Sequence, residues 1–132
     1  MIVLDASAVI DALLDTSPFA ERIHEHLLEN EGDLHAPHLI DAEIGQVLRR
    51  HVLARQIKQA RADRAIERLQ RLGITRYPHL LFLSRAMRLH RNLTVYDALY
   101  VVLAEALAAP LLTRDGRLAR SADRLVEVFH VR

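Results

Sequence analysis

Apolar residues along this chain fall into two alternating patterns. Short, mostly apolar runs predict buried strands at residues 1–5, 34–37, 74–77, 111–113 and 126–131. Between these runs, apolar positions recur at helical spacing, which predicts helices at residues 6–15, 18–29, 39–54, 59–72, 79–90, 94–108 and 116–122. Strands that alternate with helices are typical of an α/β sandwich, so we predict a mostly parallel central sheet of four to five strands.

The chain has 132 residues, and we expect residues 1–132 to form a single domain because no repeat or linker divides them. Its longest apolar region, residues 95–112, is long enough to suggest a membrane span. However, Asp97, Glu105 and Pro110 interrupt this region. We therefore interpret it as a buried helix followed by a strand, and we expect no association with a membrane.

The sequence contains no cysteine, which excludes disulfides, thiolate metal sites and a cysteine nucleophile. The first residues, MIVLDASAV, include no basic stretch, and Asp5 interrupts their apolar run. We therefore do not expect a secretory signal peptide. These observations favour a location in the reducing cytoplasm.

Charge is distributed unevenly along the chain, although the net charge is only +1. Residues 1–48 hold ten acids and one arginine, whereas residues 49–91 hold twelve arginines and lysines and two acids. Such a basic middle segment is a candidate surface for phosphates, or alternatively a solvated helical face. If the segment binds RNA, its candidate contacts with the RNA backbone are Arg61, Arg64, Arg68 and Arg71.

Two of the predicted strands end in a carboxylate. Asp5 follows the first apolar run, and Asp115 follows the run at residues 111–113. Each acid could act simply as the N-cap of the next helix, with Ser7 assisting Asp5. In parallel sheets, however, ligands bind beyond the carboxyl ends of the strands. Both acids are therefore predicted to lie together at that edge of the sheet.

The helix predicted at residues 39–54 carries an acid on its apolar side. At about 100° per residue, Glu43 falls inside the apolar arc, between Leu39 and Val47, while Asp41 falls at its edge. An ionised carboxylate in an apolar core is very costly unless it is paired or binds a metal. Exposure to solvent therefore suits Asp41 but not Glu43, which we predict to belong to a functional site.

Asp97 lies at the start of a helix that is apolar on nearly every side. One interpretation is a capping box, with Thr94 as the N-cap and an acid three residues later. The position also suits a functional carboxylate, because the helix dipole stabilises negative charge at an N-terminus. Glu105 lies two turns further along and could support a site or form a salt bridge.

Each acid has an ordinary structural explanation, but four of them are predicted to converge: Asp5, Glu43, Asp97 and Asp115. Converged carboxylates would take up protons unless a cation lay among them. Oxygen ligands alone select a hard cation, so we predict Mg²⁺ or Mn²⁺. No histidine pair with zinc-protease spacing, no glycine-rich phosphate loop and no Ser-His-Asp pattern competes with this interpretation.

Three stretches of the sequence resemble PIN-domain proteins and, more narrowly, VapC-type toxins of toxin–antitoxin pairs: IVLDAS, LIDAEIGQVLRR and LTVYDALYVVLAEALAAPLLTRDGRLA. The resemblance spans nearly the whole chain, although the segment from about residue 55 to 93 carries no matching signature. It implies an α/β/α sandwich. It also implies metal-binding acids at Asp5, Glu43, Asp97 and Asp115, and supporting hydroxyls at Ser7 and Thr113.

The same resemblance implies an endoribonuclease that depends on Mg²⁺ or Mn²⁺. We expect Asp5 and Asp97 to be the central ligands, with Glu43 and Asp115 completing the set. The family further implies a homodimer that is inhibited by a cognate antitoxin protein bound in the acidic groove.

Two other functions compete with this one. A phospho-acceptor receiver domain also gathers acids at strand ends, but it needs a lysine at a late strand end, and Lys58 lies in the wrong region. A non-catalytic RNA-binding or protein-interaction module on the same fold is expected to lack at least one of the four acids, and all four are present.

Overall fold

The computed structural model describes residues 1–15 and 17–132, which include a sheet of five parallel strands. The strands lie side by side in the order β3-β2-β1-β4-β5. Their bounds are β1 Ile2–Leu4, β2 Leu34–Pro37, β3 Thr75–Tyr77, β4 Leu111–Thr113 and β5 Val128–His130. The predicted α/β class, with a parallel sheet of four to five strands, is confirmed.

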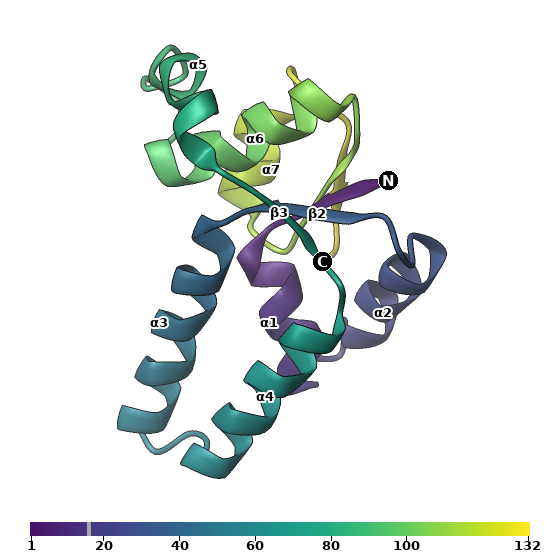
Figure 1. Ribbon diagram of the computed structural model, residues 1–132, viewed down its shortest axis with the longest axis vertical. Coiled ribbons are helices and arrows are strands. Elements are labelled where there is room, and N and C mark those ends of the chain that lie inside the picture. Colours follow the sequence, from purple (N-terminus) through teal and green to yellow (C-terminus); the bar gives the residue numbers. More distant parts are fainter. Residues whose placement is uncertain (16) are drawn as a thin grey trace.

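Helices cover both faces of the sheet and complete an α/β/α sandwich (Figure 1). One face, drawn below the sheet, carries α1 Ala6–Leu14, α2 Ala20–Glu29, α3 Leu39–Leu53 and α4 Gln59–Arg71. The other face carries the 3₁₀ helix η1 His79–Phe82, α5 Leu83–Met87, α6 Val95–Leu107 and α7 Gly116–Ala122. Among these helices, α6 packs across the central strands β1, β2 and β4.

Most of the predicted elements agree with the structure to within two residues at either end. The exception is the helix predicted at residues 79–90, where the chain instead forms η1, the short α5 and a turn. No side chain of η1 is buried, and within α5 only Ala86 is. Because tertiary packing supplies most of the stability of a protein helix, a segment with so little burial does not continue as one regular α-helix.

The apolar region at residues 95–112 is a buried helix followed by a strand, as predicted. Every residue of α6 from 98 to 104 is buried, and β4 follows directly after Pro110. Across residues 1–15 and 17–132, no helix combines the length and the apolar character needed to cross a membrane.

The strand order places a crevice at one edge of the sheet. β1 lies in the middle of the sheet, and its three residues have no exposed surface. Its neighbours β2 and β4 lie on opposite sides, and the helices that follow β1 and β4 pass to opposite faces (Figure 1). Ligands of open parallel sheets bind where connections diverge in this way, beyond the carboxyl ends of the strands. Asp5 and Asp115 directly follow the two strands concerned.

Candidate active site

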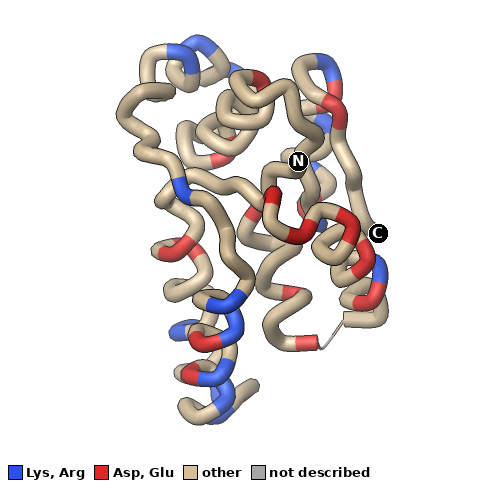
Figure 2. The backbone as a smooth tube through the Cα atoms, turned by 45° about the vertical axis from the view of Figure 1, so that its right-hand side comes forward, with Lys and Arg blue, Asp and Glu red and all other residues tan. Residues whose placement is uncertain are grey.

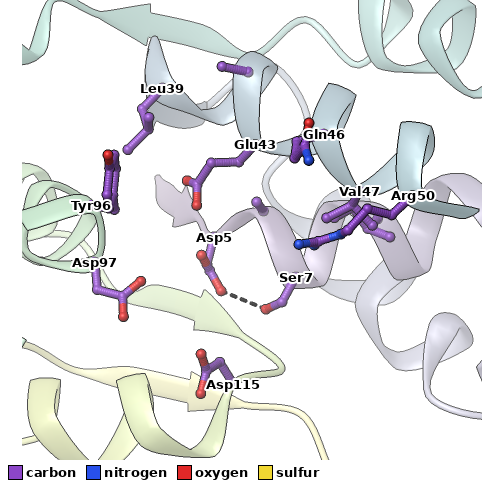
Figure 3. A pocket seen from close by; sticks show the side chains of 13 residues that line it. Asp5, Ser7, Leu39, Glu43, Gln46, Val47, Arg50, Tyr96, Asp97 and Asp115 are labelled. Atoms are coloured by element: carbon purple, nitrogen blue, oxygen red, sulfur yellow. Dashed lines mark hydrogen bonds between the residues drawn. The ribbon is translucent and has the colours of Figure 1, made fainter. Parts of the chain in front are cut away.

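A cavity of about 490 Å³ opens beyond the carboxyl ends of β1 and β4 (Figure 3). Four carboxylates from separate parts of the chain line it, namely Asp5, Glu43, Asp97 and Asp115. Apolar side chains of α1 and α3 form much of the remaining wall. The structure therefore brings the four acids selected from the sequence to a single place.

Asp5 is the most buried of these acids, with 6% of its surface exposed. It stands at the N-cap position of α1, but its side chain makes no capping bond. Instead its Oδ2 accepts hydrogen bonds of 2.6 Å from the Ser7 hydroxyl and 2.8 Å from the Thr113 hydroxyl. Burial raises the pKa of Asp5, the two hydroxyls lower it, and the charge of Asp115 raises it. The two predicted hydroxyls thus fix the orientation of this carboxylate.

Asp115 both caps the following helix and lines the cavity, which are the two roles that the sequence left open. Its Oδ1 accepts hydrogen bonds from the backbone N–H groups of Arg117, at 2.8 Å, and Leu118, at 3.2 Å, and so caps α7. Its own N–H donates to the Thr113 hydroxyl at 2.9 Å. The carboxylate also lines the cavity (Figure 3), so the capping bonds determine how it is presented there.

Glu43 points into the cavity from α3, on the side of the helix that also carries Leu39 and Val47 (Figure 3). Its Oε1 accepts a hydrogen bond of 2.6 Å from the hydroxyl of Tyr100 on α6. Burial raises the pKa of Glu43, the tyrosine hydroxyl lowers it, and the charges of two neighbouring acids raise it further. Glu43 is therefore half-buried, and its carboxylate is held by the hydroxyl of Tyr100.

Asp97 lies in the first turn of α6, and its carboxylate points into the cavity (Figure 3). Its backbone N–H donates to the hydroxyl of the N-cap residue Thr94 at 3.2 Å, which supplies one half of the proposed capping box. Burial raises the pKa of Asp97, and the charges of Asp5 and Asp115 raise it further. The acids of the cavity therefore influence one another electrostatically.

Two other acids considered from the sequence form ion pairs elsewhere. Asp41 accepts two hydrogen bonds from Arg76 of β3, at 2.6 and 2.8 Å, and does not line the cavity. Glu105 accepts two from Arg85 of α5, at 2.9 and 3.0 Å. Of the alternatives for Glu105, the salt bridge is therefore the one present.

The cavity offers carboxylate oxygens as possible ligands. As the side chains are placed, no three acids or histidines among residues 1–15 and 17–132 are close enough to hold a metal ion by themselves. Like charges gathered in one cavity repel one another or take up protons. A divalent cation would relieve the repulsion, and an oxygen-only donor set fits Mg²⁺ or Mn²⁺. The oxygen donors that line the cavity come mainly from the four acids.

Two arginines of the basic middle segment make structural contacts. Arg61 donates to the carbonyl of Leu14, and Arg68 donates to the carbonyls of Leu13 and Ala12 at 2.6 and 3.0 Å. The last carbonyls of a helix lack partners within the helix, and cationic groups stabilise that end. Arg61 and Arg68 therefore cap the C-terminal end of α1 from α4, which leaves their guanidinium groups less available to RNA.

The other two candidate arginines, Arg64 and Arg71, are exposed on α4. Arg71 makes a weak contact of 3.7 Å with Glu67 on the same helix. Figure 2 shows many Lys and Arg residues along α4 and the adjoining end of α3, with two acids of α4 among them, whereas acidic residues gather around α2. Part of the basic character of the middle segment thus becomes a surface feature at the α3–α4 end of the molecule.

Tyr100 and Arg50 are among the side chains at the site that were missed in the sequence. Tyr100 could have been found, because a tyrosine in a helix buried on all sides needs a partner for its hydroxyl. Arg50 lines the cavity from α3, and its guanidinium group points toward Ser7 (Figure 3). Nothing in the sequence distinguishes it from the other arginines of the basic segment.

Comparison with known protein families assigns the fold to a family. The model of the PIN domain matches residues 2–124. The chain belongs to the PIN domain family.

Several curated relatives match this PIN domain over nearly their full length. Ribonuclease VapC1 of Mycobacterium tuberculosis is 44% identical, and the match covers 98% of this chain and 97% of that protein. VapC ribonuclease Mb0985 of Mycobacterium bovis is 41% identical over 90% of this chain and 89% of its own. Ribonuclease VapC12 of Mycobacterium tuberculosis is 36% identical over 97% of each.

Two solved structures resemble this PIN domain. PAE2754 from Pyrobaculum aerophilum superposes with a TM-score of 0.72 at 23% identity, covering 96% of this chain and 89% of its own. FitAcB from Neisseria gonorrhoeae superposes with a TM-score of 0.67 at 22% identity, covering 98% and 97%. At these identities the likeness establishes the shared fold.

Proposed function

We propose that this protein is an endoribonuclease that depends on Mg²⁺ or Mn²⁺ and acts as the toxin of a toxin–antitoxin pair. The observation that carries the proposal is the cavity beyond β1 and β4, into which four carboxylates project from separate parts of the chain. The similarity to VapC ribonucleases over almost the whole chain supports RNA as the substrate.

The four acids have distinct proposed tasks. Asp5 and Asp97 are the central ligands, because two hydroxyls orient Asp5 and the start of α6 positions Asp97. Glu43 and Asp115 complete the set of oxygen donors. When bound there, Mg²⁺ or Mn²⁺ would supply Lewis-acid stabilisation of the charge that develops at the scissile phosphate.

Arginines of the basic middle segment are proposed to hold the RNA backbone. Arg64 and Arg71 are exposed on α4, and Arg50 lies at the wall of the cavity itself. Contacts with phosphates position a nucleic acid but carry no sequence information. We therefore expect these residues to contribute affinity without selecting the cleavage site.

The proposed partners are a cognate antitoxin protein, bound in the acidic cavity, and a second copy of the chain. Three side chains of η1 and α5 support association with another chain, since Leu80, Leu81 and Met87 are 77%, 79% and 53% exposed. Apolar surface of this kind favours burial in an interface. A molar mass measured in solution that matched the monomer would contradict the homodimer.

The cytoplasm is the proposed location of this function, because an RNA substrate is found there and the sequence has no cysteine that would need oxidation. Residues 1–132 are proposed to act as one functional unit, since the four acids of the cavity range from Asp5 to Asp115.

Cleavage by the purified protein tests the proposal. Labelled RNA is incubated with wild type, Asp5→Asn and Asp97→Asn in the presence of Mg²⁺, Mn²⁺ or a chelator. Cleavage is expected from wild type with metal only. Near wild-type cleavage by either folded variant would contradict the assignment of the four-acid cavity as the nuclease site. RNA that is bound but never cut would identify a non-catalytic RNA-binding module instead.

A further inference from the structure

Tyr96 is an aromatic residue that is open to solvent at the cavity. The sequence contains three tyrosines, three phenylalanines and no tryptophan. Of these six aromatic residues, which all belong to the part of the chain that the structure describes, Tyr96 is the only exposed one, with 62% of its surface accessible. It lines the cavity of the four acids and directly precedes Asp97 in the first turn of α6. Its ring therefore offers apolar surface to a ligand of the cavity.

The two other tyrosines each have a structural partner. Tyr77 hydrogen-bonds His35 at 2.8 Å, and the Tyr100 hydroxyl donates to Glu43 at 2.6 Å. Among residues 1–15 and 17–132, the Tyr96 hydroxyl makes no hydrogen bond, and its ring neither stacks on another aromatic ring nor packs against the hydrophobic core. The contacts of these residues therefore give no reason for an aromatic side chain at position 96.

The surroundings of Tyr96 fit a nucleotide. In Figure 3, Tyr96 lies with Leu39 on one side of Asp5, and both residues line the cavity. Arg50 lies on the other side of Asp5 and also lines the cavity. The cavity thus has an apolar side, a central group of acids and a positively charged side. A nucleotide within an RNA chain has matching groups, because its base has a π-face that stacks on aromatic rings and its phosphates are anionic.

We propose that Tyr96 is the stacking platform for the nucleobase next to the phosphate that is cut. The inference rests on the proposed ribonuclease function and adds to it a contact with a base. Stacking on an aromatic ring tolerates any base, because every base has a π-face. Tyr96 is therefore expected to hold a nucleotide beside Asp97 without selecting its identity, while arginines hold the phosphates.

Binding of RNA with and without its bases tests the proposal. The probes are a short single-stranded RNA and an abasic chain with the same number of phosphates and thus the same charge. Both are titrated in Mg²⁺ against the non-cutting Asp5→Asn protein that carries Tyr96, Tyr96→Phe or Tyr96→Leu. Tyr96→Leu is expected to weaken binding of the RNA by about fivefold or more and to leave binding of the abasic chain unchanged. Tyr96→Phe keeps the ring and is expected to bind both probes as tightly as the protein with Tyr96.

Fluorescence provides a second readout that does not depend on affinity. The sequence has no tryptophan, so Tyr96→Trp introduces a single indole at the cavity. The RNA is expected to quench the fluorescence of this indole by stacking a base on it, and the abasic chain is expected to leave it unchanged. Leu28→Trp is the matched control, because Leu28 is 72% exposed on α2 and does not line the cavity. Neither probe is expected to quench the control.

Each result bears on a defined claim. A protein with Tyr96 that binds neither probe contradicts RNA as the substrate, and with it both the proposed function and this inference. RNA binding that is unchanged in Tyr96→Leu overturns the inference alone. Equal weakening of the RNA and the abasic chain also overturns it, because the lost contact then does not involve a base. Equal quenching of Tyr96→Trp and Leu28→Trp by RNA overturns it as well.

Discussion

The hydroxyl of Thr113 donates to the carboxylate of Asp5 at 2.8 Å and accepts the backbone N–H of Asp115 at 2.9 Å. One completely buried side chain at the end of β4 thus connects two acids of the cavity. It does so across the pairing of β1 with β4, where the two crossover connections diverge. The geometry of the proposed metal ligands is therefore coupled to the stability of the sheet itself.

Thr113→Val is expected to destabilise the protein by about 1–3 kcal/mol, because it leaves a buried N–H without a partner and removes a donor to Asp5. Urea unfolding measures the loss. Thr113→Ser, which keeps the hydroxyl, serves as the control and should lose clearly less. Equal stability of wild type and Thr113→Val would show that the hydroxyl contributes nothing net.

The contribution of the cavity acids to stability without metal is expected to decrease as the pH rises above about 4. Burial raises the pKa of Asp5, Glu43 and Asp97 above the ordinary values of 3.8, 4.5 and 3.8. The folded state then binds more protons than the unfolded state between the ordinary and the raised values, so the free energy of unfolding falls across that window. Below the ordinary values this stability is fully present.

Urea unfolding in chelator at a series of pH values checks this expectation. Asp5→Asn removes one of the three contributing groups, so its stability should fall less steeply with pH, and near neutral pH it should equal or exceed that of wild type. A slope as steep as that of wild type would exclude Asp5 as a contributor.

Glu43→Gln is expected to abolish most metal-dependent RNA cleavage, whereas Asp41→Asn is expected to leave it near the wild-type level. The two acids lie on the same helix, but Glu43 points into the cavity and Asp41 pairs with Arg76. Asp41→Asn should cost at most about 1 kcal/mol of stability, because the ion pair is partly exposed. The opposite ranking in the cleavage assay would refute the proposed role of Glu43.

Mn²⁺ is expected to raise the melting temperature of wild type by binding the folded state only. Linkage gives a stabilisation of roughly 2.7 kcal/mol at a concentration a hundredfold above the dissociation constant. Thermal unfolding followed over a range of Mn²⁺ concentrations measures the effect, with Asp97→Asn as the comparison. If saturating Mn²⁺ shifted both proteins equally, its binding would lie outside the four-acid cavity.

RNA affinity is expected to depend on Arg64 and Arg71 of α4. It is not expected to depend on Arg61 and Arg68, whose guanidinium groups are bonded to carbonyls of α1. In an Asp97→Asn background, which does not cut RNA, Arg64→Gln combined with Arg71→Gln should weaken binding. The slope of the logarithm of the binding constant against the logarithm of the salt concentration should become shallower by about 0.7 per lost contact. Arg61→Gln combined with Arg68→Gln should chiefly lower stability. Binding of a non-specific RNA, measured at several salt concentrations, distinguishes the two pairs. If the Arg64→Gln and Arg71→Gln variant changes neither the affinity nor its salt dependence, α4 is a solvated face.

The spacing of apolar residues was sufficient to predict the α/β fold class. The acids at strand ends and on apolar helix faces were sufficient to predict that four carboxylates come together. The strands of this chain are short and apolar, and their alternation with amphipathic helices admits few arrangements. Residues 79–90 were mispredicted because a local pattern does not reveal how little of a segment becomes buried. The strand order was not predicted, since it depends on contacts between residues far apart in the chain.

Contacts between distant side chains were beyond prediction for the same reason. The helical wheel placed Glu43 on the correct side of α3, but it could not supply Tyr100, which lies 57 positions later. Likewise, Arg61, Arg64, Arg68 and Arg71 look alike in the sequence. Only the packing of α4 against α1 distinguishes Arg61 and Arg68, which bond to carbonyls of α1, from the other two.

The pairing of β1 with β4 also bears on when the protein can become active. Thr113 and Asp5 are 108 positions apart, so a chain still on the ribosome carries Asp5 and Glu43 long before Asp115 exists. Until β4 is made, β1 lacks one of its two neighbours and the cavity lacks a wall. A truncated or growing chain therefore has no assembled site. For a protein proposed to cut RNA, the topology itself delays activity until synthesis is nearly complete.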